Sequence, residues 1–246
     1  MKLSIIIVNF KTDKLVADCI ASVKKNTKKI KYEIIVIDNS VDNRGFAKAN
    51  NVGIKQAKGK YILLLNSDTI VKERAIDKLF DFAEGHPDAG VIGPKLLNKD
   101  GSVQDSVFHS PTVINAIREF WFGQKGFFGL YVPKVEIATE VDAIVGAAML
   151  ITPAALKQAG NLNEKYFFYY EDLDYCRKVH GTGLKIYYLP QAEVVHLKGA
   201  SGKNLSADNK QWNRLVPSSK IYHGIVGHHV LRIVIWLGQK WEKIFK

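Results

Sequence analysis

Three short, uninterrupted apolar runs lie in the first third of the chain. They occupy residues 3–8 (LSIIIV), 33–37 (EIIVI) and 61–65 (YILLL), and such runs are typical of strands covered on both faces of a parallel sheet. Between them, Leu15, Cys19 and Val23 recur at helical spacing, and residues 47–54 and 75–84 carry further helical patterns. This alternation predicts an α/β fold, a doubly wound and mostly parallel sheet with its ligand crevice at the carboxyl ends of the strands.

Beyond Pro94 the periodicity loosens before it returns. Residues 120–131 are rich in aromatic side chains and contain three glycines, so we interpret them as a mobile flap or an insertion on the acceptor side. Regular patterns then predict a strand at 147–152, a helix at 153–159, a helix at 172–179 and a strand at 185–189. Gly181 and Gly183 follow the second of these helices, where glycine commonly ends a helix.

The last part of the chain has the pattern of an amphipathic helix. One face carries apolar residues: Val226, Val230, Ile233, Val234, Leu237, Trp241, Ile244 and Phe245. The other carries basic and imidazole side chains: His228, His229, Arg232, Lys240, Lys243 and Lys246. The apolar part is too short to cross a bilayer, so the pattern favours a helix lying on an anionic membrane surface. A helix packed on the rest of the protein or in a dimer is the alternative.

Composition adds charge and redox information. The formal net charge is +11, and residues 196–246 hold nine Lys/Arg against two Asp/Glu, which suggests nucleic acid, a membrane surface or an anionic substrate without choosing among them. Cys19 and Cys176 lie far apart without metal-ligand spacing, so we expect no disulfide framework or zinc site and a reducing cytoplasm. The first apolar run is too short for a membrane span.

Polar residues follow each of the three predicted strands. Asn66-Ser67-Asp68 follows the third, where a carboxylate could hold a hard cation that bridges two phosphates; a helix N-cap is the alternative for Asp68. Asp38 and Asn39 follow the second, where Asp38 could accept a hydrogen bond from a base imide, although turn chemistry explains them equally well.

A loop and helix start come next, with residues that allow close approach of a nucleotide. Asn43, Gly45 and Asn51 belong to this segment, and small residues and amides there are weak evidence taken singly.

The segment 167–174 (FFYYEDLD) is the most unusual in the sequence. Four aromatic residues, which could stack on sugar rings, run into three carboxylates, and clustered acids raise one another's pKa. Asp172 would lie in the first turn of a helix, where the dipole favours an anion available as a general base. An aromatic core edge followed by capping acids is the alternative. Arg177 fits an intrahelical partner of Asp174, and His196, after an apolar strand, could complete a transition-metal site.

Taken in order, these segments resemble a known family. The segments are 7–10 (IVNF), 36–40 (VIDNS), 43–46 (NRGF), 65–68 (LNSD), 141–142 (VD), 146–149 (GAAM), 170–174 (YEDLD) and His196. Together they resemble the rhamnosyltransferase-like branch of glycosyltransferase family two, over roughly residues 2–201. The resemblance implies a GT-A fold, an inverting mechanism and a divalent metal, Mn²⁺ or Mg²⁺.

The resemblance also implies roles for individual residues. Asp172, with Glu171 beside it, matches the catalytic position, and Asp68 with His196 matches the metal site. The donor side comprises Asn9, Asp38, Asn39, Asn43, Gly45, Asn51, Asn66 and Asp68, and the acceptor side comprises Asp142, Gly146, Tyr169 and Tyr170. Two departures stand out: the chain is short between Ser40 and Asn43, and Asn66 replaces the first acid of the family's Asp-x-Asp motif.

From this resemblance we expect an inverting, metal-dependent glycosyltransferase that uses a nucleotide diphosphate sugar, dTDP-rhamnose or a UDP-sugar, and a glycan or lipid-linked acceptor in cell-surface polysaccharide or glycolipid synthesis. The expected domains are 1–220, with a nucleotide-sugar-binding half at 1–95 and an acceptor and catalytic half at 96–220, followed by the basic helix at 221–246. The expected location is the cytoplasm, peripheral on the inner face of the membrane, with no nucleic acid partner; the oligomeric state stays open.

Two other functions remain open on the residues alone. A nucleotidyltransferase that makes nucleotide sugars could share the sheet and the metal-binding Asp, but we would expect a Gly-rich, basic loop after its first strand, where this chain has residues 9–12 (NFKT). A non-catalytic module that binds sugar or nucleic acid is the other, favoured by the basic tail.

Overall fold

A mixed central sheet forms the body of the protein. The computed structural model describes residues 1–197 and 212–245. Its main sheet has the strand order β2-β1-β3-β10-β5-β11-β4, and β8 pairs with β11. The bounds are β1 (Leu3–Asn9), β2 (Tyr32–Asp38), β3 (Tyr61–Asn66), β4 (Thr69–Val71), β5 (Ala89–Leu97), β8 (Thr139–Glu140), β10 (Ala148–Ile151) and β11 (Lys185–His196). A small second sheet joins β7 (Leu130–Tyr131), β6 (Val107–Phe108) and β9 (Ala143–Ile144).

The first half follows the predicted doubly wound pattern. β1 pairs in parallel with both β2 and β3, and β5 pairs in parallel with β11. β10 lies between β3 and β5 and is antiparallel to both, so the sheet is mixed at its centre. The two apolar runs predicted at 185–189 and 193–195 are one strand, β11, with register irregularities against β5.

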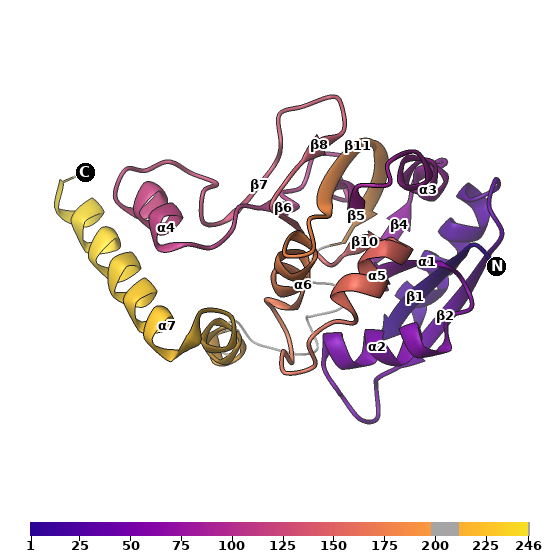
Figure 1. Ribbon diagram of the computed structural model, residues 1–246, viewed down its shortest axis with the longest axis horizontal. Coiled ribbons are helices and arrows are strands. Elements are labelled where there is room, and N and C mark those ends of the chain that lie inside the picture. The colour runs from indigo at the N-terminus through magenta and orange to yellow at the C-terminus, as the bar shows by residue number, and fades with distance from the viewer. Residues whose placement is uncertain (198–211, 246) are drawn as a thin grey trace.

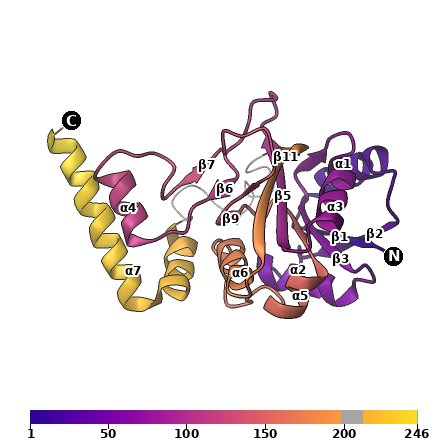
Figure 2. The ribbon, with the colours of Figure 1, turned by 45° about the horizontal axis from the view of Figure 1, so that its top comes forward.

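Helices cover both faces of the sheet, as Figures 1 and 2 show. α1 (Asp13–Asn26) and α3 (Ala75–Gly85) pack on one face, in a cluster with alternate residues of β1 such as Leu3, Ile5 and Ile7. α2 (Phe46–Gln56), α5 (Pro153–Ala159) and α6 (Glu171–His180) pack on the other, in a cluster that includes Ile6. Because successive strand residues point to opposite faces, an uninterrupted apolar run fills both clusters.

Two helices lie apart from the sheet. α4 (Val113–Phe120) and α7 (Trp212–Phe245) pack against each other at the side of the molecule away from β1 and β2 (Figures 1 and 2). Trp121 Nε1 donates a hydrogen bond to the Val234 carbonyl (3.0 Å), and the Trp121 and Trp241 rings stack with centroids 6.1 Å apart. α7 is kinked at Gly224, where φ is 72°. None of the described helices is long and apolar enough to cross a membrane.

The kink in α7 lies close to the boundary predicted at residue 220, and the helix predicted from Val226 starts just after it. One assignment on that helix was wrong. His228 is not on an exposed polar face but is buried, with its Nδ1 2.8 Å from Ser219 Oγ, because this side of α7 faces the protein. Lys246 lies outside the described residues. The domain division itself stays a prediction.

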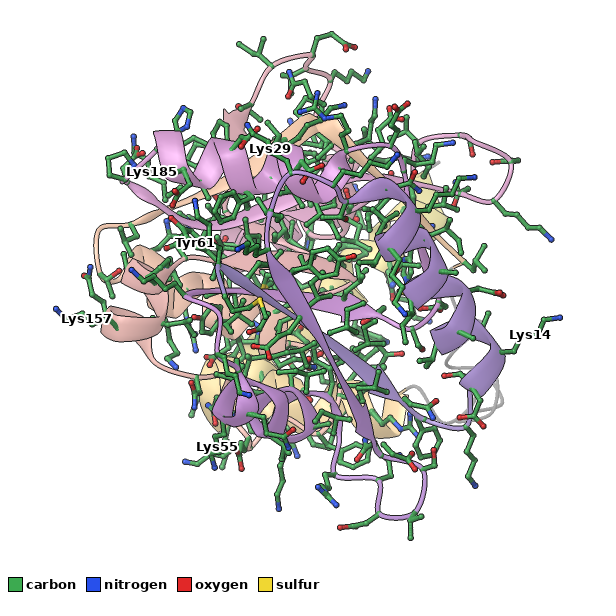
Figure 3. The ribbon with its side chains drawn as sticks, turned by 90° about the vertical axis from the view of Figure 1, so that its right-hand side faces the viewer. Lys14, Lys29, Lys55, Tyr61, Lys157 and Lys185 are labelled. Atoms are coloured by element: carbon green, nitrogen blue, oxygen red, sulfur yellow. The ribbon has the colours of Figure 1, made fainter. Side chains whose placement is uncertain are left out.

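Basic side chains are also spread over the rest of the surface. Lys14 of α1, Lys55 of α2 and Lys157 of α5 are exposed and point outward around the β1–β2 side of the molecule (Figure 3). Some lysines there are paired, as Lys29 is with Asp81 at 2.9 Å. Part of the positive charge on this side is therefore balanced by a neighbouring carboxylate.

Candidate active site

The polar residues that follow the strands meet at one edge of the sheet. In the parallel register Asn9 lies opposite Asp38, and Val8 lies opposite Asn66. The Asn39 N–H donates to the Asn9 carbonyl (2.8 Å). The carboxyl ends of β1, β2 and β3 therefore bring the three predicted polar clusters together, as a doubly wound sheet requires.

Asn9 shapes its own turn. Its Oδ1 accepts hydrogen bonds from the Thr12 N–H (3.0 Å) and from Thr12 Oγ1 (3.1 Å), while its Nδ2 donates to Asp13 Oδ1 (2.6 Å). Thr12 Oγ1 lies 3.1 Å from Ser67 Oγ. These contacts fix the β1–α1 turn against the β3 end. Asn9 is not among the residues that line the pocket described below, so its donor role stays a prediction.

Two asparagines build the loop that follows β2. Asn39 is buried, its Oδ1 accepts from the Arg44 N–H (3.0 Å) and its Nδ2 donates to Asn43 Oδ1 (3.2 Å). Asn43 Oδ1 also accepts from the Gly45 N–H (3.2 Å). The short segment between Ser40 and Asn43 is thus held by side-chain amides.

Asp38 is exposed beside that loop. Its Oδ1 accepts from the Ser40 N–H (3.0 Å), and hydrogen bonds from the side chain and backbone of Ser40 lower the pKa of its carboxyl. Asp38 is therefore an anionic acceptor in contact with solvent, a state suited to the base-reading role that the resemblance implies.

A pocket opens beside these strand ends. The residues that line it come from five segments of the chain: Val8, Phe10, Asn39, Asn43, Gly45, Phe46, Asn66, Ser67, Phe167, Phe168 and Arg214. Asn39, Asn43, Gly45 and Asn66 were predicted as donor residues from the sequence, and the structure brings all four into this one pocket. We call it the donor pocket.

The side of the donor pocket opposite the strand ends combines two aromatic residues of the predicted sugar-stacking segment with an arginine that the sequence did not reveal. Phe167 and Phe168 contribute aromatic faces, and the Arg214 guanidinium lies 5.9 Å from the centroid of each ring. Arg214 comes from α7, close in space but distant in sequence, and no local motif marked it. An arginine beside a pocket that ends in amides and hydroxyls suits an anionic ligand such as a diphosphate.

Gly45 allows the loop after β2 to lie directly against the backbone of Phe167. Its φ is 82°, and a Cβ there would lie within overlap distance of the Phe167 carbonyl oxygen. The Phe46 N–H donates to that same carbonyl (2.9 Å). Only glycine allows this approach, so the predicted Gly45 is required by the backbone of the pocket.

Asn51 lies away from the donor pocket, contrary to its predicted donor role. Its Oδ1 accepts from the Leu162 N–H (3.1 Å), and its Nδ2 donates to the Leu162 carbonyl (2.9 Å) and to Glu164 Oε1 (3.0 Å). These bonds use its polar groups to attach α2 to the loop before the aromatic segment, because a buried amide must be satisfied inside the protein.

Asp68 and His196 meet through strand pairing. β4 and β11 are antiparallel, with His196 opposite Thr69, and the Leu197 N–H donates to the Asp68 carbonyl (2.8 Å). His196 Nε2 lies 3.5 Å from Asp68 Oδ1, and both side chains are largely buried. The ladder therefore assembles the pair predicted as metal ligands.

Gln104 sets the tautomer of His196. Gln104 Nε2 donates to Asn98 Oδ1 (2.7 Å) and to the His196 carbonyl (3.2 Å), which leaves Gln104 Oε1 as an acceptor 2.7 Å from His196 Nδ1. Nδ1 must then carry the hydrogen, and a neutral His196 presents the lone pair of Nε2 toward Asp68. Gln104 was not identified from the sequence.

This donor set fits a divalent cation. An imidazole nitrogen with a hydrogen-bonded second nitrogen and a carboxylate oxygen are ordinary ligands of Mn²⁺. Within residues 1–197 and 212–245 no group of three or more His, Cys, Asp or Glu side chains is placed to hold a metal.

Asp172 is oriented at the start of α6. Its Oδ2 accepts from the Gly146 N–H (3.0 Å) and its Oδ1 from the Leu173 N–H (2.8 Å). Burial raises the pKa of this carboxyl, and the backbone hydrogen bonds oppose the rise. A carboxylate with a raised pKa that is held by two N–H groups is suited to accept a proton.

Glu171 has a different environment. It is buried, its Oε2 has no hydrogen-bond partner among the described residues, and burial together with the Asp172 charge raises its pKa well above the usual range. Of two adjacent carboxyls, the one with hydrogen-bond donors ionises first. Asp172 is thus the anion of the pair and Glu171 holds its proton longer.

The backbone before Asp172 is unusual. Tyr169 and Tyr170 both have left-handed φ, at 73° and 70°, a conformation that costs non-glycine residues on the order of 1 kcal/mol or more each. The Phe168 and Tyr169 rings contact edge to face at 4.6 Å. This sharp turn connects the aromatic wall of the donor pocket to the carboxylates within a few residues.

Gly146 links Asp172 to the donor pocket. A Cβ on Gly146 would lie 3.4 Å from the Phe46 ring, which lines the pocket, and 3.7 Å from Asp172 Cβ. Gly146 therefore lies between the pocket wall and the carboxylate, and its predicted acceptor role stays a prediction.

Asp142 lines a second pocket. Its neighbours there are Ser110, Ala143, Leu173, Arg177, His180 and Tyr222. Asp142 Oδ2 accepts from the Ser110 N–H (2.7 Å). Arg177 donates to Asp174 (2.6 Å), the intrahelical pair that the sequence predicted, and its guanidinium lies 3.8 Å from the Tyr222 ring centroid. The two pockets have no lining residue in common, so Asp142 does not share the donor pocket.

Comparisons with known proteins bear on the family and the fold of the chain. A family profile described as "Glycosyltransferase like family 2" matches residues 2–217. The low-salt glycan biosynthesis hexosyltransferase Agl10 of Haloferax volcanii is 24% identical, over 89% of this chain and 76% of its own. An N-acetylglucosaminyl-diphospho-decaprenol L-rhamnosyltransferase of Mycobacterium tuberculosis is 30% identical, over 57% of this chain and 48% of its own, so the match spans about half of that relative.

Solved structures share the fold at low identity. GalNAc-T7, crystallised with UDP, GalNAc and Mn²⁺, superimposes with a TM-score of 0.62 at 16% identity, over 80% of this chain and 44% of that one. S. aureus TarS 1-349, also solved with UDP, gives 0.55 at 17% identity, over 91% and 71%. The expected GT-A fold is thereby confirmed. With the family profile covering most of its length, the chain belongs to glycosyltransferase family 2 and is a glycosyltransferase.

Proposed function

We propose that the protein transfers a sugar from a nucleotide diphosphate sugar to an acceptor hydroxyl with inversion at the anomeric carbon, with Asp172 as the base. The observation that carries this proposal is the position of Asp172. Its carboxylate is fixed by the Gly146 N–H, and Gly146 lies against Phe46 of the donor pocket. A proton acceptor next to a pocket of amide and arginine groups suits a reaction with an anionic donor.

The donor would enter with its nucleotide at the ends of β1 and β2. Asp38, exposed beside the donor pocket but not part of its lining, would supply an anionic acceptor for a base imide. The Asn39–Asn43 loop would lie between the base and the diphosphate. Asn66, Ser67 and Arg214 line the part of the pocket where the diphosphate would lie. A uridine or thymidine base carries the imide that Asp38 would accept from, so a UDP-sugar or dTDP-rhamnose is the proposed donor class.

The transfer follows from this arrangement. Asp172 accepts the proton of the acceptor hydroxyl while the hydroxyl oxygen attacks the anomeric carbon, and the bond to the diphosphate breaks on the opposite side. A single displacement of this kind inverts the anomeric configuration. Burial and the neighbouring Asp172 charge raise the pKa of Glu171, so Glu171 loses its proton at higher pH than Asp172 and does not compete for the hydroxyl proton while it is protonated.

A divalent cation, Mn²⁺ or Mg²⁺, would be held by Asp68 and His196, and when bound it would supply positive charge to the departing diphosphate. Gln104 keeps Nε2 of His196 free of hydrogen for that purpose. Because Asn66 stands where an acid is common in the family, Asp68 would be the single motif carboxylate at this position.

The proposed acceptor is a glycan or a lipid-linked sugar in the synthesis of a cell-surface polysaccharide or glycolipid. The names of two relatives support it, since one is a glycan biosynthesis hexosyltransferase and the other acts on a sugar diphospho-decaprenol. The pocket around Asp142, Arg177 and His180 would receive it. Nucleotide sugars and two buried free thiols fit the cytoplasm, and a lipid-linked acceptor would put the enzyme on the inner face of the membrane.

The nucleotidyltransferase alternative finds no support at the first strand. The 9–12 turn (NFKT) contains no glycine, and the Asn9 side chain holds it through hydrogen bonds with Thr12 and Asp13. It therefore differs from the glycine-rich loop that would enclose a triphosphate. A binding module without catalysis has no need of the oriented pair at Glu171 and Asp172.

A nucleotide-release assay tests the proposal. The protein is incubated separately with UDP-, dTDP- and GDP-sugars, and a lipid extract supplies the acceptor. Each donor is tested in the presence of Mn²⁺, Mg²⁺ or EDTA. We expect release of one nucleoside diphosphate that requires both acceptor and metal, and an inverted anomeric linkage by NMR. Retained configuration would refute the single displacement, and release that is unchanged by EDTA would refute the metal site.

A further inference from the structure

An apolar row on α7 is exposed. Val226, Val230, Ile233, Leu237 and Trp241 recur three or four residues apart after the Gly224 kink, and their exposed fractions run from 41% to 77%. Residues at this spacing share one face of a helix. We call this face the α7 stripe. Single exposed apolar side chains are ordinary, but a contiguous row of them marks an interaction site.

The opposite face of the same helix is packed, which fixes the direction of the stripe. Leu231 is buried, and a Cβ on Gly238 would lie 2.8 Å from both Phe120 Cβ and Trp121 Cδ1. The Trp121 indole N–H is bonded to the Val234 carbonyl. α7 therefore cannot rotate to hide the stripe without losing its contacts with α4.

A cationic row runs beside the stripe. Arg232, Trp236 and Lys240 follow one another at four-residue spacing, all three are exposed, and Lys240 Nζ lies 5.8 Å from the Trp236 ring centroid. Residues 212–246 hold six Lys/Arg and one acidic residue, Glu242. Phe122, which follows the Trp121 that stacks on Trp241, is also exposed.

We infer that the α7 stripe is a docking surface for an anionic lipid bilayer, with the stripe inserted among the acyl chains and the Arg232–Lys240 row at the headgroups. Tryptophan is enriched at membrane interfaces because one end is apolar and the other polar. A helix with an apolar face and cationic flank lies in the plane of the interface. A second copy of this chain would bring a like-charged row against this one, so charge complementarity selects the lipid.

Docking through the α7 stripe would also position the proposed acceptor pocket relative to the membrane. Tyr222, just before the kink, lines the pocket that holds Asp142 and Arg177. Docking through the part of α7 after the kink would hold that pocket near the headgroups. This last step rests on the proposed function, whereas docking itself does not.

Point substitutions test the surface better than truncation, because removing α7 would uncover α4. The stripe variant is Val226→Gln with Ile233→Gln and Leu237→Gln, which keeps helix propensity and avoids the Trp121–Trp241 contact. The matched control is Val103→Gln with Ile137→Gln, two exposed apolar residues outside α7. The charge variant is Arg232→Gln with Lys240→Gln.

Flotation with vesicles of phosphatidylcholine alone or with phosphatidylglycerol gives the readout. We expect the parent and the control to float with the anionic vesicles, less as salt rises. The stripe variant should lose binding on the order of 100-fold, and the charge variant about fivefold per residue. Thermal melts check that all variants fold, and nucleotide release is measured separately.

Three outcomes overturn the inference. A parent protein that stays unbound on anionic vesicles refutes it, as does a folded stripe variant that floats like the parent. Sedimentation that shows a dimer broken by the stripe variant, without vesicle binding, would assign the surface to a second copy. If the stripe variant does not fold, the charge variant provides the test. The inference requires the charge variant to lose the preference for anionic vesicles that the parent shows, and an unchanged preference refutes the inference.

Discussion

Asp172→Asn removes the proposed base with little change in volume. In the parent both carboxylate oxygens accept backbone hydrogen bonds, from Gly146 at 3.0 Å and from Leu173 at 2.8 Å. An amide has one acceptor oxygen, so its NH₂ group must face one of these N–H donors. The variant thus loses the proton acceptor and one of the two anchoring bonds.

The two losses appear in different measurements. Removing a general base lowers kcat by about 10² to 10⁴-fold, which corresponds to about 3 to 5 kcal/mol of activation free energy. An unsatisfied buried N–H costs about 1 to 3 kcal/mol of folding stability. Donor affinity should change little, because Asp172 is separated from the donor pocket by Gly146.

Initial rates of nucleotide release with saturating donor and acceptor measure the first loss, and calorimetric titration of the donor measures the affinity. Asp18→Asn, on the exposed face of α1, is the matched control and should keep the parent rate. In the parent, kcat/KM should rise as the pH passes through the raised pKa of Asp172. This rise should be absent from the pH–rate profile of Asp172→Asn. A folded Asp172→Asn protein that turns over near the parent rate would refute the assignment of the base.

Three further predictions concern groups around the site. Gln104→Leu removes the acceptor that fixes the His196 tautomer, so Mn²⁺ affinity measured by calorimetry should fall about 10 to 100-fold while the melting temperature drops little; unchanged affinity would contradict the pairing. Glu171→Gln should raise the melting temperature by about 2 to 4 °C per kcal/mol gained at pH 7. Burial raises the Glu171 pKa, so the parent loses folding stability as the pH rises from the ordinary glutamate range through the pKa of the folded state. The variant should lack this pH dependence. Identical curves of stability against pH for parent and variant would contradict the raised pKa. Gly45→Ala should weaken donor binding by tenfold or more, because its Cβ would meet the Phe167 carbonyl; full affinity would show that the loop can shift.

The sequence predicted the parts of the site that depend on local pattern. Apolar runs located β1, β2 and β3, and polar residues directly after them, such as Asp68, had to meet at one edge of a parallel sheet. The helix start placed Asp172 in its first turn. Spacing along the chain carried this information, so no knowledge of distant contacts was needed.

What the sequence could not give depends on contacts between distant segments. Gln104 is 92 residues from His196, and only the pairing of β11 with its neighbours brings the two side chains together. Arg214 reaches the donor pocket from α7, far along the chain from the other residues of the lining. Asn51 looked like a nucleotide ligand, yet its amide is bonded to Leu162, 111 residues away. Asparagine amides bind ligands in some places and hold the fold together in others, and only the hydrogen-bond partner distinguishes the two roles.

The most direct test of the central claim is the anomeric configuration of the transferred sugar, measured by NMR on product made from an α- or β-linked nucleotide diphosphate sugar. A single displacement with Asp172 as the base predicts the opposite configuration in the product, and no product from Asp172→Asn above about 1% of the parent rate. Product with the donor's own configuration, or full-rate product from the variant, would contradict the account.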